Sequence, residues 1–246
     1  MIDQLYKSLE IPKECYLGKP IFKKLFYENG KLGVTDKKAF TDDIEKIIWV
    51  QSFKPETINI AVYQDEEREY QEIALIQVNL KKPTRIKRLA EIIHRTIPYP
   101  IWLVFVDGEK VAFSIGTKRI NKADKEKMMV DQFWETDWID LAGPTEVEQD
   151  FLKSCAVTNF SYSDFLAFYQ DLEARIIGLK SAKHTGSFEV KKENRTELLT
   201  QIHELEQKII ELKAQTKREE QFNQKVELNI KIKELEAELK QTQAKL

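Results

Sequence analysis

Two groups of basic residues lie on either side of an expected β-hairpin, and both could bind phosphate groups. The candidate phosphate-binding residues are Lys81, Lys82, Arg85, Arg88, Arg95, Lys118 and Arg119. Arg85, Arg88 and Arg95 recur at spacings that place them on roughly one side of a helix. Lysine and arginine attract phosphates whatever the base sequence, so the set predicts sequence-independent contact with nucleic acid. The alternative is a solvated helix face balanced by nearby acidic residues.

The strand expected at residues 73–80 has the positions at which a restriction-type nuclease would carry a metal-binding acid and a lysine. Gln77 and Asn79 occupy those positions. Neither side chain supplies the negative charge that a hydrolytic metal site needs, although Asp65 and Glu72 could substitute for them. The pattern therefore predicts no catalytic or metal-binding residue. A divergent metal-dependent nuclease with a restriction-type core is the alternative to a binding protein.

The other reactive residue types form no recognisable site. The three histidines, His94, His184 and His203, lack the spacing of metal ligands, and the two cysteines are too far apart for a metal or redox motif. Gly116-Thr117-Lys118 lacks the upstream glycine and following helix of a phosphate-binding loop. We therefore expect no cofactor.

Composition narrows the class of protein. The chain has 246 residues, 42% of them hydrophobic, which is typical of a soluble globular protein. Its net charge of −2 excludes attraction of the whole protein to nucleic acid or to an anionic membrane. The first residues lack the apolar segment of a signal peptide, and no apolar run is long enough to span a bilayer. These features predict a cytoplasmic protein without a membrane partner.

The elements that must position these residues are clearest between residues 73 and 119. Apolar residues first have the spacing of a strand, and then, from residue 86, the spacing of a helix. Pro98 and Pro100 end the helix. Ile101–Val106 is a nearly unbroken apolar run, typical of a strand covered on both faces, and Asp107-Gly108 predicts a hairpin to a return strand.

The flanking regions add helices and a second hairpin. We expect helices near residues 1–10, from Lys19-Pro20 to residue 30, and from a Thr35 cap to about residue 48, although residues 47–53 could already be strand. A hairpin follows, in which residues 57–63 and 72–80 flank an acidic tip at residues 64–69. After residue 119 we expect a charged connector and two edge strands. Ser163 is expected to cap a helix with a broad apolar face. Its aromatic residues are read as core, and a base-stacking surface or ligand cleft is the alternative.

The last 52 residues, 195–246, have the composition of a coiled coil, without glycine, proline, tryptophan or tyrosine. The predicted oligomerisation residues recur in steps of three and four and are Leu198, Ile202, Leu205, Ile209, Leu212, Ile232, Leu235 and Leu239. The apolar phase slips at residues 215–225. The tail could therefore pair with itself, pair with a partner, or fold back as a hairpin at that slip.

These elements predict an α+β fold, with a mostly antiparallel sheet and packed helices, followed by a long C-terminal coiled-coil helix. The expected organisation is an α+β sheet domain over 1–143, a helical subdomain over 144–182, a linker over 183–194 and a coiled coil over 195–246. An apolar stripe on so long a helix needs another helix to cover it. The sequence thus predicts a protein that associates with itself or with another protein.

Residues 93–121 carry a helix that ends in Ile97-Pro98-Tyr99-Pro100, an apolar strand, and a return strand that leads into Lys118-Arg119. This block resembles a bacterial family, the domain of unknown function numbered 4391. The resemblance implies gene neighbours that encode helicases and methyltransferases of restriction-like, phage-defence clusters, and it implies no catalytic residue. We therefore expect an accessory interaction subunit of a bacterial DNA-modification or phage-defence assembly, with helicase or methyltransferase subunits as possible partners.

Overall fold

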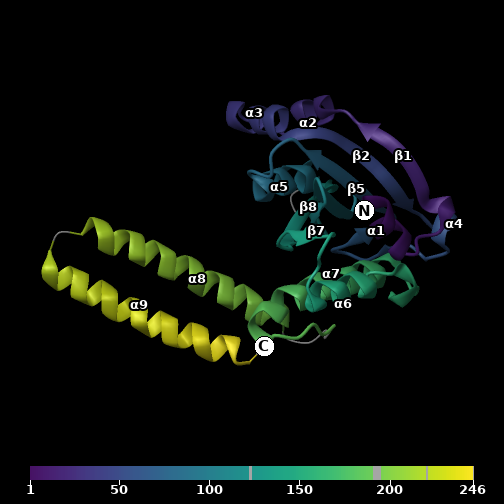
Figure 1. The fold of residues 1–246 in the computed structure, drawn as a ribbon. Helices are drawn as coiled ribbons and strands as arrows, with labels where there is room; N and C mark the ends of the chain where they lie inside the picture. Colours follow the sequence, from purple (N-terminus) through teal and green to yellow (C-terminus); the bar gives the residue numbers. More distant parts are fainter. Residues whose placement is uncertain (122–123, 191–194, 220, 246) are drawn as a thin grey trace. The chain divides into compact units, whose positions relative to one another are not determined.

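The computed structural model describes residues 1–121, 124–190, 195–219 and 221–245 (Figure 1). The chain divides into two compact units, Met1–Ile176 and Ile177–Leu246. Within the described ranges, every helix is too short or too polar to cross a membrane.

The first unit is built around a mixed sheet. Among the described residues this sheet has seven strands, which are β1 (Tyr16–Ile21), β2 (Ile44–Phe53), β5 (Ile73–Leu80), β6 (Ile101–Asp107), β7 (Lys110–Asn121), β8 (Asp124–Glu135) and β9 (Ile139–Asp140). The strand order is β1-β2-β5-β6-β7-β8, and β9 pairs with β7. Neighbouring strands are antiparallel except β5 and β6, which are parallel. The predicted mixture of helices with a mostly antiparallel sheet is confirmed.

Helices cover this sheet, and a two-stranded hairpin lies outside it. The helices that lie wholly in the first unit are α1 (Ile2–Ser8), α2 (Lys23–Asn29), α3 (Val34–Asp43), α4 (Pro55–Ile58), α5 (Ile86–Thr96) and α6 (Glu146–Ser154). Helix α7 (Phe165–Thr185) begins in the first unit and ends in the second. The hairpin consists of β3 (Tyr63–Gln64) and β4 (Glu69–Tyr70).

The core lies on both faces of the central strands, β5 and β6. On one face, alternate residues of β5 pack with Leu89 and Ile93 of α5 and with Phe40 of α3. On the other face, the ring of Trp102 on β6 stacks 6.2 Å from that of Phe160, just before α7. Burial on both faces explains the nearly unbroken apolar runs in these strands.

Two helix boundaries differ from the sequence predictions because strand pairing takes residues that have a helical pattern. A helix was expected to begin at Lys19, but the residues up to Ile21 belong to β1 and pair with β2. Helix α2 begins only at Lys23. Helix α3 ends at Asp43 rather than near residue 48, because Ile44–Phe53 forms a strand between β1 and β5. Tertiary pairing thus overrides local spacing.

Two further details were also predicted differently. The expected charged connector after Arg119 is largely strand, since β7 continues to Asn121 and pairs with β8. The start of α7 is capped by Asp164 rather than by Ser163, because Oδ1 of Asp164 accepts a hydrogen bond from the backbone N–H of Ala167 at 2.8 Å. Ser163 instead donates a hydrogen bond to Asp164.

The second unit contains the end of α7 and two long helices, α8 (Arg195–Arg218) and α9 (Phe222–Gln243). The two helices pack along each other as a helical hairpin, and Lys213 Nζ lies 2.8 Å from Glu236 Oε1 between them (Figure 1). The structure therefore has the fold-back that was one of the three predicted alternatives, and not one long coiled-coil helix. The break falls at the slip in apolar phase, so each run of apolar residues can face the other.

Candidate functional site

The three predicted arginines, Arg85 just before α5 and Arg88 and Arg95 on it, are paired with carboxylates. Arg85 binds Asp43 through Nε and Nη2, both at 2.7 Å, and this pairing lowers the pKa of the buried Asp43 carboxyl. Arg88 bridges Asp36 and Glu91, and Arg95 Nη1 lies 2.8 Å from Glu91 Oε1. A paired guanidinium has already lost much of its attraction for phosphate.

The remaining four predicted phosphate-binding residues do not share one surface. Lys118 is only 2% exposed, and its ammonium donates hydrogen bonds to the carbonyl oxygens of His94 and Ile97. Lys118 is therefore an interior residue rather than part of a basic surface. Arg119 Nε lies 2.9 Å from Asp131 Oδ1. Lys81 and Lys82 are exposed, and within the described residues no salt bridge joins either of them to a carboxylate.

The positions at which a nuclease would carry its acid and lysine form a neutral hydrogen-bonded chain. Tyr6 donates to Gln77 Oε1 at 2.7 Å, and Gln77 Nε2 donates to Asn79 Oδ1 at 2.6 Å. Asp65 accepts hydrogen bonds from the backbone N–H groups of its own turn, and Glu72 pairs with Lys54. In the part of the chain that the structure describes, no three His, Cys, Asp or Glu side chains form a possible metal site.

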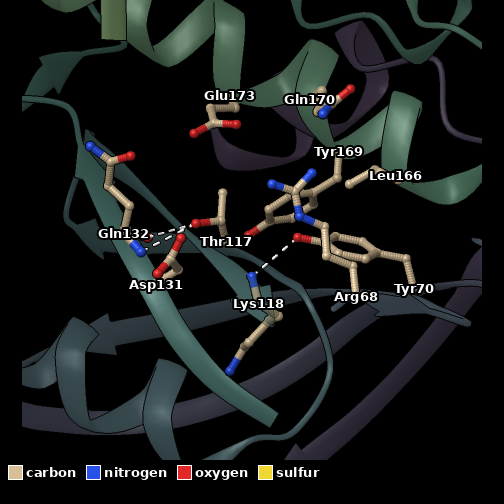
Figure 2. Close-up of a pocket in the computed structure, with 10 residues that line it drawn as sticks. All are labelled: Arg68, Tyr70, Thr117, Lys118, Asp131, Gln132, Leu166, Tyr169, Gln170 and Glu173. Carbon is tan, nitrogen blue, oxygen red and sulfur yellow. Dashed lines mark hydrogen bonds between the residues drawn. The ribbon is translucent and has the colours of Figure 1, made fainter. Parts of the chain in front are cut away.

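A polar pocket of about 120 Å³ lies in the first unit, where α7 faces the sheet near the β3–β4 hairpin (Figure 2). Helix α7 contributes Leu166, Tyr169, Gln170 and Glu173, and the sheet contributes Thr117 and Lys118 from β7 with Asp131 and Gln132 from β8. The hairpin contributes Arg68 and Tyr70.

Backbone contacts fix the hairpin beside β7. The N–H of Ile120 donates to the carbonyl oxygen of Glu67 at 2.7 Å, and the N–H of Lys118 donates to the Tyr70 hydroxyl at 3.1 Å. The Lys118 side chain then runs away from the other labelled residues, so that only its main chain contributes polar atoms to the pocket (Figure 2). These contacts hold Arg68 and Tyr70 opposite the side chains of α7.

The polar groups of the pocket differ in how many of their hydrogen bonds are already made within the protein. The Tyr169 hydroxyl donates to the carbonyl oxygen of Ile101 at 2.8 Å and accepts from the N–H of Gly116 at 3.0 Å. Glu173 accepts from Trp134 Nε1 at 3.0 Å through Oε1, and burial raises the pKa of its carboxyl. Among the described residues, the Arg68 guanidinium lies in no salt bridge, and the Tyr70 hydroxyl proton has no acceptor.

This pocket was missed by sequence reasoning. Arg68 lies inside the predicted acidic tip, residues 64–69, and Tyr169 belongs to the predicted apolar face of the helix after Ser163. The pocket is lined by Leu166 and Tyr169 of that face, for which a ligand cleft remains the alternative prediction. The sequence signal that could have found the pocket is polar residues close to a buried tyrosine on one helix. Gln170 is next to Tyr169, and Glu173 lies one turn beyond it.

The predicted oligomerisation residues are largely covered within the hairpin unit. Ile202, Leu205, Ile209 and Ile232 are buried, and Leu198, Leu212, Leu235 and Leu239 are half-buried. Among the side chains that the structure describes, the large apolar residues that α8 and α9 expose are different ones, namely Ile210 at 58%, Val226 at 41% and Ile230 at 52%.

Comparisons with known proteins identify one family. A family model described as a domain of unknown function, DUF4391, matches residues 9–239. A search of curated proteins and a search of solved structures each returned no match.

Proposed function

The chain belongs to the family of the domain of unknown function DUF4391, and on that premise we propose that it is a cytoplasmic accessory subunit of a bacterial DNA-modification or phage-defence assembly. It associates through the α8–α9 hairpin, which packs against the same hairpin of a second copy. The gene neighbours that the family resemblance implies, helicases and methyltransferases, support the assembly context.

The observation that carries this proposal is the apolar surface that the hairpin leaves exposed. Val226 and Ile230 are four residues apart on α9, so they are neighbours on one face of that helix. A two-helix hairpin has a single internal contact, and these residues lie outside it. Covering each such side chain contributes about 1–2 kcal/mol, and two hairpins can do so by forming a four-helix bundle.

The change Val226→Gln with Ile230→Gln is expected to weaken self-association of the full-length chain by roughly tenfold to hundredfold. Both side chains are more than two-fifths exposed, so the hairpin itself should stay folded. Mass measured by light scattering over a dilution series gives the dissociation constant, and circular dichroism reports the helix content. The buried Ile232→Gln is the contrasting variant, which should lose helix content. A wild-type chain that is monomeric at every concentration would rule out self-association.

Nucleic-acid contact is a second part of the proposal and rests on Lys81 and Lys82. Each phosphate contact contributes about 0.9 to the slope of log affinity against log salt. The change Lys81→Gln with Lys82→Gln is therefore expected to reduce that slope by about 2 in a fluorescence titration with duplex DNA. The matched change Arg88→Gln with Arg95→Gln alters paired arginines and should have a smaller effect. Equal slopes for the wild type and both variants would contradict this assignment.

The rival proposal is a divergent metal-dependent nuclease. The antiparallel pair β2–β5 followed by α5 supports it, because a restriction-type core has its motif on such a pair beside a helix. The neutral chain from Tyr6 to Asn79 weighs against it. Magnesium-dependent cleavage of plasmid DNA that disappears on Asp65→Asn or Glu72→Gln would favour this rival.

A further inference from the structure

We propose that the pocket between the β3–β4 hairpin, β7, β8 and α7 binds a small zwitterion of the amino-acid type, with its carboxylate at Arg68 and its ammonium at Glu173. The pocket lies wholly in the first unit. The inference is therefore independent of the association proposed for α8 and α9.

The size of the pocket limits the ligand. Its volume is about 120 Å³, and a cavity of roughly 150 Å³ holds one benzene molecule. A ligand with about five to eight non-hydrogen atoms is therefore expected, which covers glycine, alanine, serine and threonine. A nucleotide or a sugar phosphate is too large for this space.

The carboxylate end is set by two donors from the hairpin. Among the described residues the Arg68 guanidinium lies in no salt bridge, and a guanidinium presents two parallel N–H groups that match a carboxylate. The Tyr70 hydroxyl already accepts the N–H of Lys118 at 3.1 Å, so its proton is available to a ligand. The ammonium of Lys118 cannot compete, because the side chain runs away from the other labelled residues (Figure 2) and donates to the carbonyl oxygens of His94 and Ile97.

The ammonium end is set by the carboxylate on α7. Trp134 Nε1 donates a hydrogen bond to Oε1 of Glu173 at 3.0 Å and so orients the carboxylate. The other oxygen, Oε2, has no hydrogen bond among the described residues. The second acid, Asp131, is already paired with Arg119 at 2.9 Å. The charge of Arg68 acts on Glu173 across the pocket, but among the described residues no cation is in direct contact with this carboxylate, so a positively charged ligand stabilises its ionised form. The pocket therefore offers one cation and one anion, which is the complement of a zwitterion.

The test is isothermal titration calorimetry of the full-length chain with glycine, L-alanine, L-serine and L-threonine, alongside acetate and ethylammonium chloride as half-ligands. At least one amino acid is expected to bind, and each half-ligand should bind roughly tenfold or more weakly. Arg68→Met and Glu173→Gln are each expected to weaken the amino acid by roughly tenfold to hundredfold. Glutamine at 173 keeps the acceptor for Trp134, so folding should be preserved.

The control is Arg95→Met, which removes an exposed arginine of α5 outside the pocket and should leave the affinity unchanged. Failure of all four amino acids to bind at about 10 mM, a range where weak specific sites saturate, would overturn the proposal. Acetate as tight as the amino acids would also overturn it, since the site would then recognise an anion alone. So would binding that Arg68→Met and Glu173→Gln both leave intact.

Discussion

Replacing Arg175 with methionine is expected to lower the free energy of unfolding by about 4 kcal/mol. The Arg175 side chain is only 6% exposed, and its three guanidinium nitrogens donate to three carbonyl oxygens. Nε donates to Ser154 at 2.7 Å, Nη1 to Asp171 at 2.7 Å and Nη2 to Asn159 at 2.9 Å. Each buried carbonyl left without a donor costs about 1–3 kcal/mol.

The arginine also fixes the geometry of the segment between α6 and α7. Its guanidinium carbon lies 4.1 Å from the centre of the Phe160 ring, which in turn stacks on Trp102 of the sheet. One side chain thus joins the end of α6, the connecting turn and α7. Methionine fills much of the volume but donates no hydrogen bond, so the loss reports on the polar contacts.

Urea denaturation followed by tryptophan fluorescence measures this change. Arg95→Met removes a 63% exposed arginine and should cost less than about 0.5 kcal/mol. Arg175→Lys keeps the positive charge but lacks the fork of donors, so we expect an intermediate loss. If Arg175→Met were as stable as Arg95→Met, the three carbonyl contacts would contribute nothing to stability.

The central block of the fold was predictable because local signals agree there. The change from strand to helical spacing in β5 and α5, the prolines at 98 and 100, and Asp107-Gly108 each fix one boundary. Gly108 indeed has a φ of 60°, a conformation that glycine adopts without strain. In the tail, the period of the apolar residues predicted two helical runs, and the slip between them marks the turn.

The polar sites could not be predicted because their partners come from distant segments. Arg175 takes its acceptors from the end of α6, from the connecting turn and from α7 itself, up to 21 residues away. Lys118 takes its acceptors from the end of α5, 21 and 24 residues earlier. In a sequence, such residues look like solvated charges. Only the packing of α5 against β7 and β8 reveals that one of the predicted surface cations is internal.

The stability of the protein is expected to rise with pH between about 7 and 8.5 because of Lys118. Burial lowers the pKa of this ammonium to about 7, whereas an unfolded lysine titrates near 10.4. Between these values the unfolded chain holds a proton that the folded chain has lost, so raising the pH favours the folded state. From pH 7 to 8.5 the gain is on the order of 2 kcal/mol. Below pH 7 both states are protonated and the contribution is constant.

Lys118→Met removes this titration, so the rise in stability should be absent from the variant, whatever its stability at pH 7. Urea denaturation at half-unit steps of pH compares it with the wild type and with Lys110→Met, which alters an exposed lysine of the same strand and should keep the rise. The upper limit of pH 8.5 matters because burial raises the pKa of the Cys155 thiol to about 12 and that of Tyr70 to about 12. Above about pH 8.5 the unfolded cysteine loses its proton first, and above about pH 10 the unfolded tyrosine does so, and both titrations oppose the rise. If the free energy of unfolding changed with pH in the same way for the wild type and Lys118→Met, the prediction would be wrong. The ammonium would then be solvated in the folded protein, and the carbonyl oxygens of His94 and Ile97 would be open to water.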